Sequence, residues 1–384
     1  MKHSSLHIIF SGGGTGGHLF PGLAVAERLA AAIPRLRITF CGSGKSFERK
    51  HVSEAGFDYL AIPARPLPGG PREAVAFMME NWAGYLAAKR FLQEESIAAV
   101  VGLGGYASVP MARAAACRRV PLVLLEQNAV PGKATRWLAR RATLICTAFE
   151  ETAARLRCQC PVRITGNPVR AGFVTGNRSR DVLGAECQDP ARRQLLVLGG
   201  SGGARALNEN VPRALYKIRG QLEGWSIVHQ SGEADFDATR TLYDKFDLPA
   251  TVLPFVRNMA TTLAASHLAV CRAGGTTLAE LAVAGVPAVL LPYPHATDNH
   301  QAANAQVFAA GGGCITIDPQ EMPGRLDDHF ADMLCFLLAN DALRQRMSAA
   351  MQKMARPNAA DEVTGLIWSI VASRSFAAEM PALA

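Results

Sequence analysis

The stretch Phe10-Ser-Gly-Gly-Gly-Thr-Gly-Gly-His-Leu-Phe-Pro-Gly-Leu-Ala-Val-Ala-Glu27 decides the fold that the sequence predicts. Five of the seven residues after Phe10 are glycine, and they separate an apolar run from a helix-like pattern. The run His7–Phe10 predicts a strand, and apolar residues that recur on one face of Pro21–Ile33 predict a helix. Glycines let a ligand approach backbone N–H groups, and the positive end of the following helix favours an anion. The stretch therefore predicts an α/β unit that binds a ligand at its first loop.

The same arrangement returns in Gln194-Leu-Leu-Val-Leu-Gly-Gly-Ser-Gly-Gly-Ala-Arg-Ala-Leu-Asn208. Further short β-rich runs lie at 37–41, 98–102, 121–125, 226–229, 250–253, 268–271 and 288–291. Strands that alternate with amphipathic helices form parallel sheets covered on both faces. Ligands of such sheets lie beyond the carboxyl ends of the strands, where both glycine loops fall. The expected fold class is α/β, with two Rossmann-like, doubly wound parallel-sheet domains whose loops face a cleft.

The length of the chain also indicates two domains. At 384 residues it exceeds what one hydrophobic core usually serves. Regular structure should stop near Gly166-Asn-Pro-Val-Arg170, because a proline restricts both itself and the residue before it. We therefore expect a first domain at residues 1–168 and a second at residues 169–358.

Composition narrows the class of protein. A hydrophobic fraction of 49% and a charged fraction of 19% are those of a soluble globular protein. The net charge of +8 permits an anionic partner, but the chain has no Lys/Arg-rich run with interleaved aromatic residues, so nucleic acid is not expected. The nine cysteines include no Cys-x-x-Cys pair, which predicts reduced thiols in the cytoplasm. No predominantly apolar stretch of about 20 residues is free of charged residues and proline, so no membrane-spanning helix is expected.

The first glycine loop has two look-alikes. The glycines at 12, 14 and 17 satisfy the dinucleotide pattern G-x-G-x-x-G between a strand and a helix. That pattern also needs an acidic residue about 20 residues on, which binds the ribose. The sequence has Thr39-Phe-Cys-Gly-Ser-Gly-Lys45 there and no acid until Glu48, which counts against an NAD-dependent oxidoreductase. Gly44-Lys45-Ser46 ends like a Walker A motif, but residue 39 is threonine where that motif needs glycine.

His18 follows the glycines directly. It could meet a phosphate or accept a proton, and its alternative role is to tie the loop together by hydrogen bonds. The loop alone does not separate these roles.

Eight motifs, taken in order along the chain, together resemble those of one family. They are Gly13-Gly-Thr-Gly-Gly-His18, Gly104-Gly-Tyr106, Glu126-Gln-Asn128, Gly166-Asn-Pro-Val-Arg170, Gly199-Gly-Ser-x-Gly-Ala204, His229-Gln-Ser-Gly232, Cys271-Arg-Ala-Gly-Gly-Thr-Thr-Leu-Ala-Glu280 and Asp298-Asn-His-Gln301. The chain resembles the MurG family within glycosyltransferase family 28, the N-acetylglucosaminyltransferases of peptidoglycan synthesis that make lipid II from lipid I. The resemblance runs from about residue 8 to about residue 360. Gly202 and Gly275 depart from it, since relatives often have glutamine and alanine there.

The resemblance implies a two-domain glycosyltransferase of the GT-B fold. Its carboxyl-terminal half would bind UDP-N-acetylglucosamine, and its amino-terminal half would bind lipid I, the undecaprenyl-diphospho-muramoyl pentapeptide. The sugar would pass to the muramoyl 4-hydroxyl with inversion, by direct displacement, without a metal or another cofactor. A carboxyl-terminal helix at about 360–375 would pack back on the first domain. The enzyme would be a peripheral protein at the cytoplasmic face of the plasma (inner) membrane.

The resemblance also assigns the residues that bind the donor. Glu280 would accept hydrogen bonds from both ribose hydroxyls, and Arg170 with Ser201 would neutralise the diphosphate as it leaves. Gln301 and Asn128 would read the sugar hydroxyls. The full set is Thr15, Gly16, Gly17, Asn128, Arg170, Ser201, Phe255, Val256, Gly275, Thr276, Thr277, Glu280 and Gln301.

Several of these residues have a structural alternative. Glu280 could be a surface carboxylate of a helix, and Arg170 could form a salt bridge at the domain linker. Asn128 and Gln301 could be turn or capping residues. The segment Phe255-Val256 would border the uracil, a role that the residues themselves do not test.

Acceptor binding is assigned by resemblance to the two loops of the first domain. The contacts with lipid I would come from Gly14, His18, Gly104, Gly105 and Tyr106. Tyr106 could instead pack beneath its loop. His18 and Glu126 are the two candidates for the catalytic base that takes the proton of the acceptor hydroxyl.

Two patterns suggest a metal, but neither predicts a metal site. Asp235-Phe-Asp237 matches the D-x-D of metal-dependent glycosyltransferases of the other major fold, yet its polar surroundings predict a loop or the start of a helix. His295 and His300 have a spacing that fits no common metal motif.

The stretch Arg72–Phe91 is the candidate for contact with an anionic membrane surface. It contains Val75, Phe77, Met78, Met79, Trp82, Tyr85 and Leu86, with Lys89 and Arg90 at one end. Apolar and aromatic residues beside cations suit an interface with anionic lipid. The alternative is a helix buried against its own sheet.

Two rival functions share the expected fold and donor site. A UDP-sugar epimerase would need no lipid acceptor, and a non-catalytic UDP-sugar sensor would bind the donor without turnover. Release of UDP that depends on lipid I separates the transferase from both.

Overall fold

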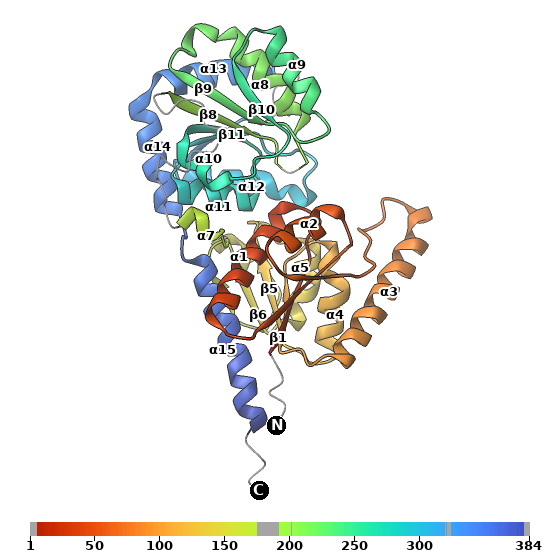
Figure 1. The fold of residues 1–384 in the computed structure, drawn as a ribbon. Helices are drawn as coiled ribbons and strands as arrows, with labels where there is room; N and C mark the ends of the chain where they lie inside the picture. Colours follow the sequence, from red (N-terminus) through yellow and green to blue (C-terminus); the bar gives the residue numbers. More distant parts are fainter. Residues whose placement is uncertain (1–5, 175–191, 201, 319, 321–323, 380–384) are drawn as a thin grey trace. The chain divides into compact units, whose positions relative to one another are not determined.

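The computed structural model describes residues 6–174, 192–200, 202–318, 320 and 324–379. It divides into two compact units, each of which is described by itself (Figure 1). Unit 1 comprises Met1–Arg170 and Asn358–Ala384, and unit 2 comprises Ala171–Pro357. The chain therefore leaves unit 1 at the end of the Gly166–Arg170 motif and returns to it at Asn358.

Unit 1 is built on a parallel sheet that has seven strands in the described part of the chain. Their order is β3-β2-β1-β4-β5-β6-β7. The strands are β1 (His7–Ser11), β2 (Arg37–Gly42), β3 (Asp58–Ala61), β4 (Ala99–Gly102), β5 (Leu122–Glu126), β6 (Leu144–Thr147) and β7 (Val162–Ile164). The direction of winding reverses between β1 and β4, which is the switch point where doubly wound sheets bind ligands.

Helices cover both faces of this sheet (Figure 1). They are α1 (Gly16–Ala32), α2 (Ser46–Glu54), α3 (Pro71–Glu94), α4 (Val109–Cys117), α5 (Lys133–Leu138), α6 (Glu150–Ala153) and α15 (Ala359–Glu379). Successive residues of a strand point to opposite faces. Ile8 and Phe10 of β1 accordingly lie in one core with α1, α2 and α15, whereas Ile9 lies in another with α3, α4 and α5.

The carboxyl-terminal helix α15 packs within unit 1. Val363, Ile367 and Val371 recur every four residues and are buried in the core that contains Ile8 and Phe10. Arg28 of α1 also forms an ion pair with Asp361 at 3.3 Å. This helix therefore completes a core that begins with the first strand of the chain.

Unit 2 repeats the architecture with a parallel sheet of order β10-β9-β8-β11-β12-β13 in its described residues. Its strands are β8 (Arg193–Leu198), β9 (Trp225–Gln230), β10 (Ala250–Leu253), β11 (Ser266–Cys271), β12 (Ala288–Leu290) and β13 (Cys314–Thr316). Its helices are α7 (Ala171–Val174), α8 (Arg205–Lys217), α9 (Phe236–Lys245), α10 (Met259–Ala265), α11 (Gly275–Ala284), α12 (His300–Ala310), α13 (Leu326–Ala339) and α14 (Asp341–Met354). Two parallel-sheet α/β units confirm the expected fold class.

The predicted start of the first helix was wrong by five residues. We expected it to begin at Pro21, but α1 begins at Gly16 and runs through Pro21. Proline has no N–H to donate to the carbonyl four residues earlier, so its usual place is the first turn. The helix nevertheless continues through it, and the last two glycines of the loop form helical backbone. His18 therefore lies in the first turn of α1 rather than in the loop.

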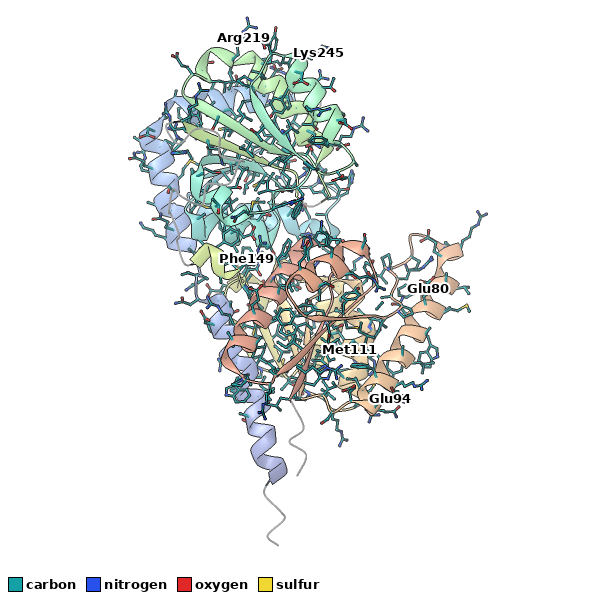
Figure 2. All side chains as sticks on the ribbon, viewed as in Figure 1. Glu80, Glu94, Met111, Phe149, Arg219 and Lys245 are labelled. Atoms are coloured by element: carbon teal, nitrogen blue, oxygen red, sulfur yellow. The ribbon has the colours of Figure 1, made fainter. Side chains whose placement is uncertain are left out.

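The helix α3 packs on the rest of unit 1 through one stripe of buried residues. Gly84, Ala88 and Leu92 are its buried residues. Ala88 and Leu92 belong to the core that also contains Met111 of α4, which Figure 2 labels. At Gly84 the backbone of the helix comes so close that an added Cβ would lie 1.9 Å from the carbonyl oxygen of Pro63.

We expect Gly84→Ala to lower the free energy of unfolding by about 3 kcal/mol, since the carbonyl of Pro63 cannot move without shifting the backbone. The control is Gly365→Ala in α15, where no atom lies within 4 Å of the added Cβ. That variant should raise stability by about 0.5–1 kcal/mol, because alanine favours helix over glycine. Urea unfolding followed by circular dichroism measures both changes. Equal midpoints for the two variants would contradict the close approach at Gly84.

Candidate active site

The site in unit 1 forms where β1 and β4 end, at the switch point of the sheet. The loop after β1 packs directly on the loop after β4, since a Cβ on Gly12 would lie 2.8 Å from the carbonyl oxygen of Gly104. Two motifs that lie about 90 residues apart in the sequence are thereby brought together. The predicted acceptor residues Gly14, His18, Gly104, Gly105 and Tyr106 all belong to these two loops or to the turns that follow them.

The imidazole of His18 lies over the Gly104–Gly105 segment. A Cβ on Gly104 would stand 2.9 Å from Cδ2 and 3.4 Å from Nε2 of His18, and one on Gly105 would stand 3.8 Å from Cε1. Both glycines also have positive φ, at +91° and +68°, a conformation that other residues rarely adopt. On the other side of the ring, Thr15 Oγ1 lies 3.2 Å from Nδ1. The Thr15 hydroxyl can accept from Nδ1–H or donate to Nδ1, and when it accepts, Nε2 carries the lone pair.

Lys45 is a functional candidate that the sequence did not predict. Its ammonium lies 5.7 Å from the centre of the Tyr106 ring and 3.9 Å from the point where a Cβ on Gly14 would stand. It therefore places a positive charge between two of the loops assigned to the acceptor. The signal in the sequence was Gly44-Lys45-Ser46, which was weighed only as a Walker A look-alike.

A buried carboxylate supports the segment that carries Lys45. Glu48 is fully buried and accepts hydrogen bonds from Ser43 Oγ at 3.0 Å, from the N–H of Gly44 at 3.1 Å and from the hydroxyl of Tyr59. Burial and this carboxylate raise the pKa of Tyr59, so its hydroxyl stays protonated and keeps donating. A Cβ on Gly13 would lie 3.1 Å from Glu48 Oε1, so the same carboxylate lies beneath the first glycine loop.

Glu126, the second candidate base, is held by its own loop. It lies at the end of β5 and is 4% exposed. Its Oε1 accepts from the backbone N–H of Asn128 at 3.1 Å and from the Asn128 side chain at 3.2 Å, and its Oε2 accepts from the N–H of Gly132 at 3.0 Å. These bonds fix the turn that carries Asn128. The side-chain amide of Asn128 thus contributes to this turn, which agrees with the alternative role of Asn128 as a turn residue.

Four predicted donor residues of unit 1 also have described positions. Thr15, Gly16 and Gly17 lie at the start of α1, beside His18. Arg170 is half-buried at the last position of unit 1, and its guanidinium lies 4.6 Å from the centre of the Phe20 ring. Since Phe20 belongs to α1, Arg170 is tied to the helix that carries His18.

The site in unit 2 forms at the corresponding end of its sheet. The second glycine loop leaves β8 at Gly199 and leads into α8 at Arg205. Its member Ser201, which was assigned to the diphosphate, lies outside the described residues. In the described part of the loop, Gln230 at the end of β9 donates to the carbonyl of Gly200, and it also accepts from the N–H of Val256. The loop segments predicted to hold diphosphate and uracil are therefore joined by one side chain.

The helix α11 carries four of the predicted donor residues. Gly275, Thr276 and Thr277 form its first turn, and Glu280 lies in its second turn. Glu280 is only 7% exposed, so the alternative of a surface carboxylate is wrong. A carboxylate held at low exposure is suited to accept hydrogen bonds from paired hydroxyl groups.

Gln301 lies in the first turn of α12, after a turn in which Asp298 and Asn299 have positive φ. Its Oε1 accepts a hydrogen bond from the backbone N–H of Tyr293 at 2.9 Å. This bond orients the side-chain amide so that its NH₂ group is the end that can donate to a sugar oxygen. Arg272 fixes the turn that contains Tyr293, because its guanidinium donates to the carbonyls of Leu291 and Pro292 at 3.0 and 3.1 Å.

The D-x-D pattern forms part of the start of a helix. Asp235 precedes α9 and accepts a hydrogen bond from Asn208 at 2.9 Å. Within the part of the chain that the structure describes, His, Cys, Asp and Glu side chains do not gather in groups of three or more that could hold a metal ion.

Two Rossmann-like units, each with glycine loops at the carboxyl ends of its strands, define a protein of the GT-B class. Models of known families identify the family within that class. The glycosyltransferase family 28 N-terminal domain matches residues 8–147, and the glycosyltransferase family 28 C-terminal domain matches residues 194–363. The chain belongs to glycosyltransferase family 28.

Individual relatives agree along almost the whole chain. A protein of Methylococcus capsulatus is 38% identical over 359 residues, which cover 93% of this chain and 96% of the relative. One of Syntrophotalea carbinolica is 36% identical over 364 residues, which cover 93% and 97%. Both are named UDP-N-acetylglucosamine--N-acetylmuramyl-(pentapeptide) pyrophosphoryl-undecaprenol N-acetylglucosamine transferase. The crystal structure of Acinetobacter baumannii MurG matches with a TM-score of 0.71 and 31% identity, covering 95% of this chain and 99% of that one.

Enzymes of other activities share only the fold. The UDP-N-acetylglucosamine 2-epimerase of Neisseria meningitidis matches with a TM-score of 0.68 but only 12% identity. The similarity in sequence therefore favours the transferase over the epimerase, which was the first rival function.

Proposed function

We propose that this chain transfers N-acetylglucosamine from UDP-N-acetylglucosamine to the 4-hydroxyl of the muramoyl group of lipid I, with inversion, and so forms lipid II for peptidoglycan. The observation that carries the proposal is the full-length similarity to enzymes named for this reaction, at up to 38% identity. The low exposure of Glu280 in unit 2 and the glycine loops at the carboxyl ends of the strands in each unit support the proposal.

The donor binds to unit 2. Glu280 accepts hydrogen bonds from the ribose hydroxyls, and the first turn of α11 directs backbone N–H groups at the diphosphate. As the bond from the sugar to the diphosphate breaks, negative charge grows on the leaving oxygen. N–H groups that are already oriented stabilise this charge without reorganising, which lowers the barrier. The amide of Gln301 donates to a sugar hydroxyl, because Tyr293 holds its oxygen.

The acceptor binds to unit 1 through its own diphosphate. The first glycine loop leads into the positive end of α1, and Lys45 adds a full positive charge beside Gly14. Tyr106 stacks under this ammonium and limits where it can move. The arrangement holds a diphosphate by charge and leaves the muramoyl group to project from it.

His18 is the base that this geometry supports best. The acceptor oxygen must lose its proton as it attacks the anomeric carbon, and a neutral imidazole can take that proton at Nε2 when Nδ1 donates to Thr15. Both oxygens of Glu126 already accept hydrogen bonds from the Asn128–Gly132 turn, so the carboxylate is engaged in holding that turn. We assign Glu126 to positioning that turn.

The experiment that tests the function measures release of UDP from UDP-N-acetylglucosamine with and without a soluble lipid I analogue. We expect release only when the analogue is present, together with a product that carries one added N-acetylglucosamine. An epimerase would change the donor without any acceptor, and a sensor would bind UDP without turnover. Folded protein that gives no acceptor-dependent UDP release would overturn the proposal.

The outer side of α3 is the surface that we assign to an anionic membrane. Val75, Met78, Met79, Trp82 and Leu86 are between 47% and 67% exposed, and they follow one stripe of the helix. Figure 2 shows side chains projecting from this side of α3, between the labelled Glu80 and Glu94. The alternative, a helix buried against its own sheet, therefore applies only to the opposite stripe of α3, at Gly84, Ala88 and Leu92.

Cations lie close to this surface. Lys89 and Arg90 belong to α3, although Arg90 pairs with Glu94 at 2.7 Å. Trp137 of α5 is 49% exposed, and the guanidinium groups of Arg113 and Arg141 each lie 6.0 Å from its ring. Exposed aromatic and apolar side chains beside cations favour the interface of an anionic bilayer. Among the residues that the structure describes, no helix is long and apolar enough to cross a membrane. We place the enzyme peripherally, at the cytoplasmic face.

We expect the double variant Met79→Asp, Trp82→Asp to weaken binding to vesicles containing anionic lipid at least tenfold. Each large apolar side chain that enters the bilayer contributes about 1.5–3 kcal/mol, and two carboxylates add repulsion. Co-sedimentation with phosphatidylglycerol vesicles measures the change. The control is Phe336→Asp, which alters a side chain of unit 2 that is 55% exposed. If both proteins bind vesicles like the unchanged chain, α3 is not the membrane surface.

A further inference from the structure

Gln230 occupies a central position in the donor site that we assign to unit 2. It is the last residue of β9, the strand between β8 and β10, and it is 2% exposed. In the sheet it is in register with Leu198 of β8 and with Leu253 of β10. The neighbouring strands β8 and β10 end at these two partners. The loops that follow them therefore pass on either side of the Gln230 side chain.

Both ends of the Gln230 amide are used, one for each loop. Its Nε2 donates to the carbonyl of Gly200 at 2.8 Å, and its Oε1 accepts from the N–H of Val256 at 3.0 Å. Its backbone carbonyl accepts from the N–H of Gly199 at 3.1 Å. A single residue thus fixes the loop that begins at Gly199 relative to the segment Phe255–Val256.

We call these contacts of Gln230 with the two loops the Gln230 clamp. The surrounding backbone leaves the clamp little freedom to move. A Cβ on Gly203, which has a φ of +77°, would lie only 2.3 Å from the carbonyl oxygen of Ser231. The backbone of the glycine loop therefore packs directly on the turn that follows Gln230. Beneath the turn, His229 is fully buried and lies 3.0 Å from both Tyr243 Oη and Asn208 Oδ1. Burial lowers the pKa of His229 to about 3, so this support stays uncharged at neutral pH.

We propose that Gln230 is a positioning residue for the UDP part of the donor, which sets the separation between the loop that binds the diphosphate and the segment that borders the uracil. The inference rests on the proposed function and deepens it. Loops that are already held in place lose less conformational freedom when a ligand binds, so the clamp increases affinity without touching the ligand. The proposal concerns the uridine diphosphate moiety and not the acceptor.

Only a group with one donor end and one acceptor end satisfies both loops. Methionine has a similar shape but offers neither a strong donor nor a strong acceptor. An ionised glutamate would place an oxygen against the carbonyl of Gly200, where two acceptors repel each other. A protonated glutamate, in contrast, donates through its O–H and accepts through its C=O, as the amide does. Lowering the pH should therefore restore the clamp in a glutamate variant.

The test compares unchanged protein, Gln230→Met and Gln230→Glu by calorimetric titration with UDP and by kinetics at varied UDP-N-acetylglucosamine and acceptor analogue. We expect both variants at pH 8 to bind UDP about 10- to 100-fold more weakly and to raise the KM for the donor by a similar factor. Methionine loses both buried hydrogen bonds, and ionised glutamate replaces the bond to Gly200 with a repulsion between two acceptors. The KM for the acceptor analogue and kcat at saturating donor should change by less than about threefold. The charge control is Gln221→Glu, at an exposed position of unit 2.

The pH series between 5 and 8 distinguishes positioning from general weakening of the fold. Gln230→Glu should regain UDP affinity as the pH falls, while Gln230→Met should not. Other ionisable groups near the clamp are His229, Tyr243, Asp235 and the exposed Arg257, and they are shared by all variants. Their effects appear equally in Gln230→Met, which therefore serves as the reference. Thermal melting at each pH shows whether affinity merely follows stability.

The outcomes separate this inference from the function on which it rests. If the unchanged protein does not bind UDP, the proposed function fails. If it binds UDP and both Gln230 variants bind equally well, the positioning role is overturned. The role is also overturned if the affinity of Gln230→Glu does not recover at low pH, or if its recovery is matched by Gln230→Met.

Discussion

Replacing His18 by alanine should lower kcat by about 10²- to 10⁴-fold at saturating donor and acceptor, the usual contribution of a positioned general base. The imidazole lies between Thr15 Oγ1 on one side and the Gly104–Gly105 backbone on the other, so its ring has a defined orientation. Removing it leaves the hydroxyl of the acceptor without a group to take its proton. The diphosphate contacts through Lys45 and Gly14 remain, so the KM for the acceptor should change little.

The pH profile gives a second readout for His18. In the unchanged enzyme the rate should fall at low pH as the imidazole becomes protonated, and this acidic limb should be missing in His18→Ala. The matched control is His329→Ala in α13 of unit 2, which should retain both the rate and the acidic limb. A variant that loses only affinity for the acceptor, with kcat intact, would instead make His18 a binding residue.

Most strands could be predicted because a strand of a parallel sheet is buried on both faces and forms a continuous apolar run. Ile8–Phe10 and Leu195–Leu198 are such runs. Four strands were missed. The strands β3, β7 and β13 lie at sheet edges and are partly exposed, so no continuous apolar run marks them, whereas β6 was missed although its four residues are buried. The start of α1 was misplaced because glycines usually mark a loop, whereas here Gly16 and Gly17 form the first turn of a helix.

The site was predictable as a set of motifs but not as a set of contacts. Short motifs report residue types, and the sequence does not show which loops the sheet brings together. The packing of His18 on Gly104 depends on β1 and β4 being neighbours, although five other elements of regular structure and about 90 residues separate them in the chain. Lys45 was missed for the same reason, because its partner Tyr106 follows a different strand. Gln230 stood in a recognised motif, but its role follows from hydrogen bonds to two loops.

Replacing Glu280 by glutamine should weaken binding of UDP and raise the KM for UDP-N-acetylglucosamine by about 10²-fold. Hydrogen bonds to a charged group contribute about 1.5–3 kcal/mol each, and glutamine keeps the shape of the side chain but not its charge. Glu280 is 7% exposed, so water cannot easily replace the lost acceptor. The control is Glu209→Gln, which removes an exposed carboxylate paired with Arg205 at 2.6 Å and should alter UDP affinity by less than about twofold.

A comparison of UDP with 2′-deoxy-UDP shows whether Glu280 acts through the ribose. The unchanged enzyme should prefer UDP, because the carboxylate accepts the hydrogen bond of the 2′-hydroxyl. Glu280→Gln should narrow this preference, since the group that recognised the hydroxyl is weakened in the variant. The two changes form a double-mutant cycle, in which the coupling between residue and hydroxyl is isolated from any general effect on the fold. If the preference for UDP is the same in both proteins, Glu280 does not bind the 2′-hydroxyl, and its burial serves the packing of α11 instead.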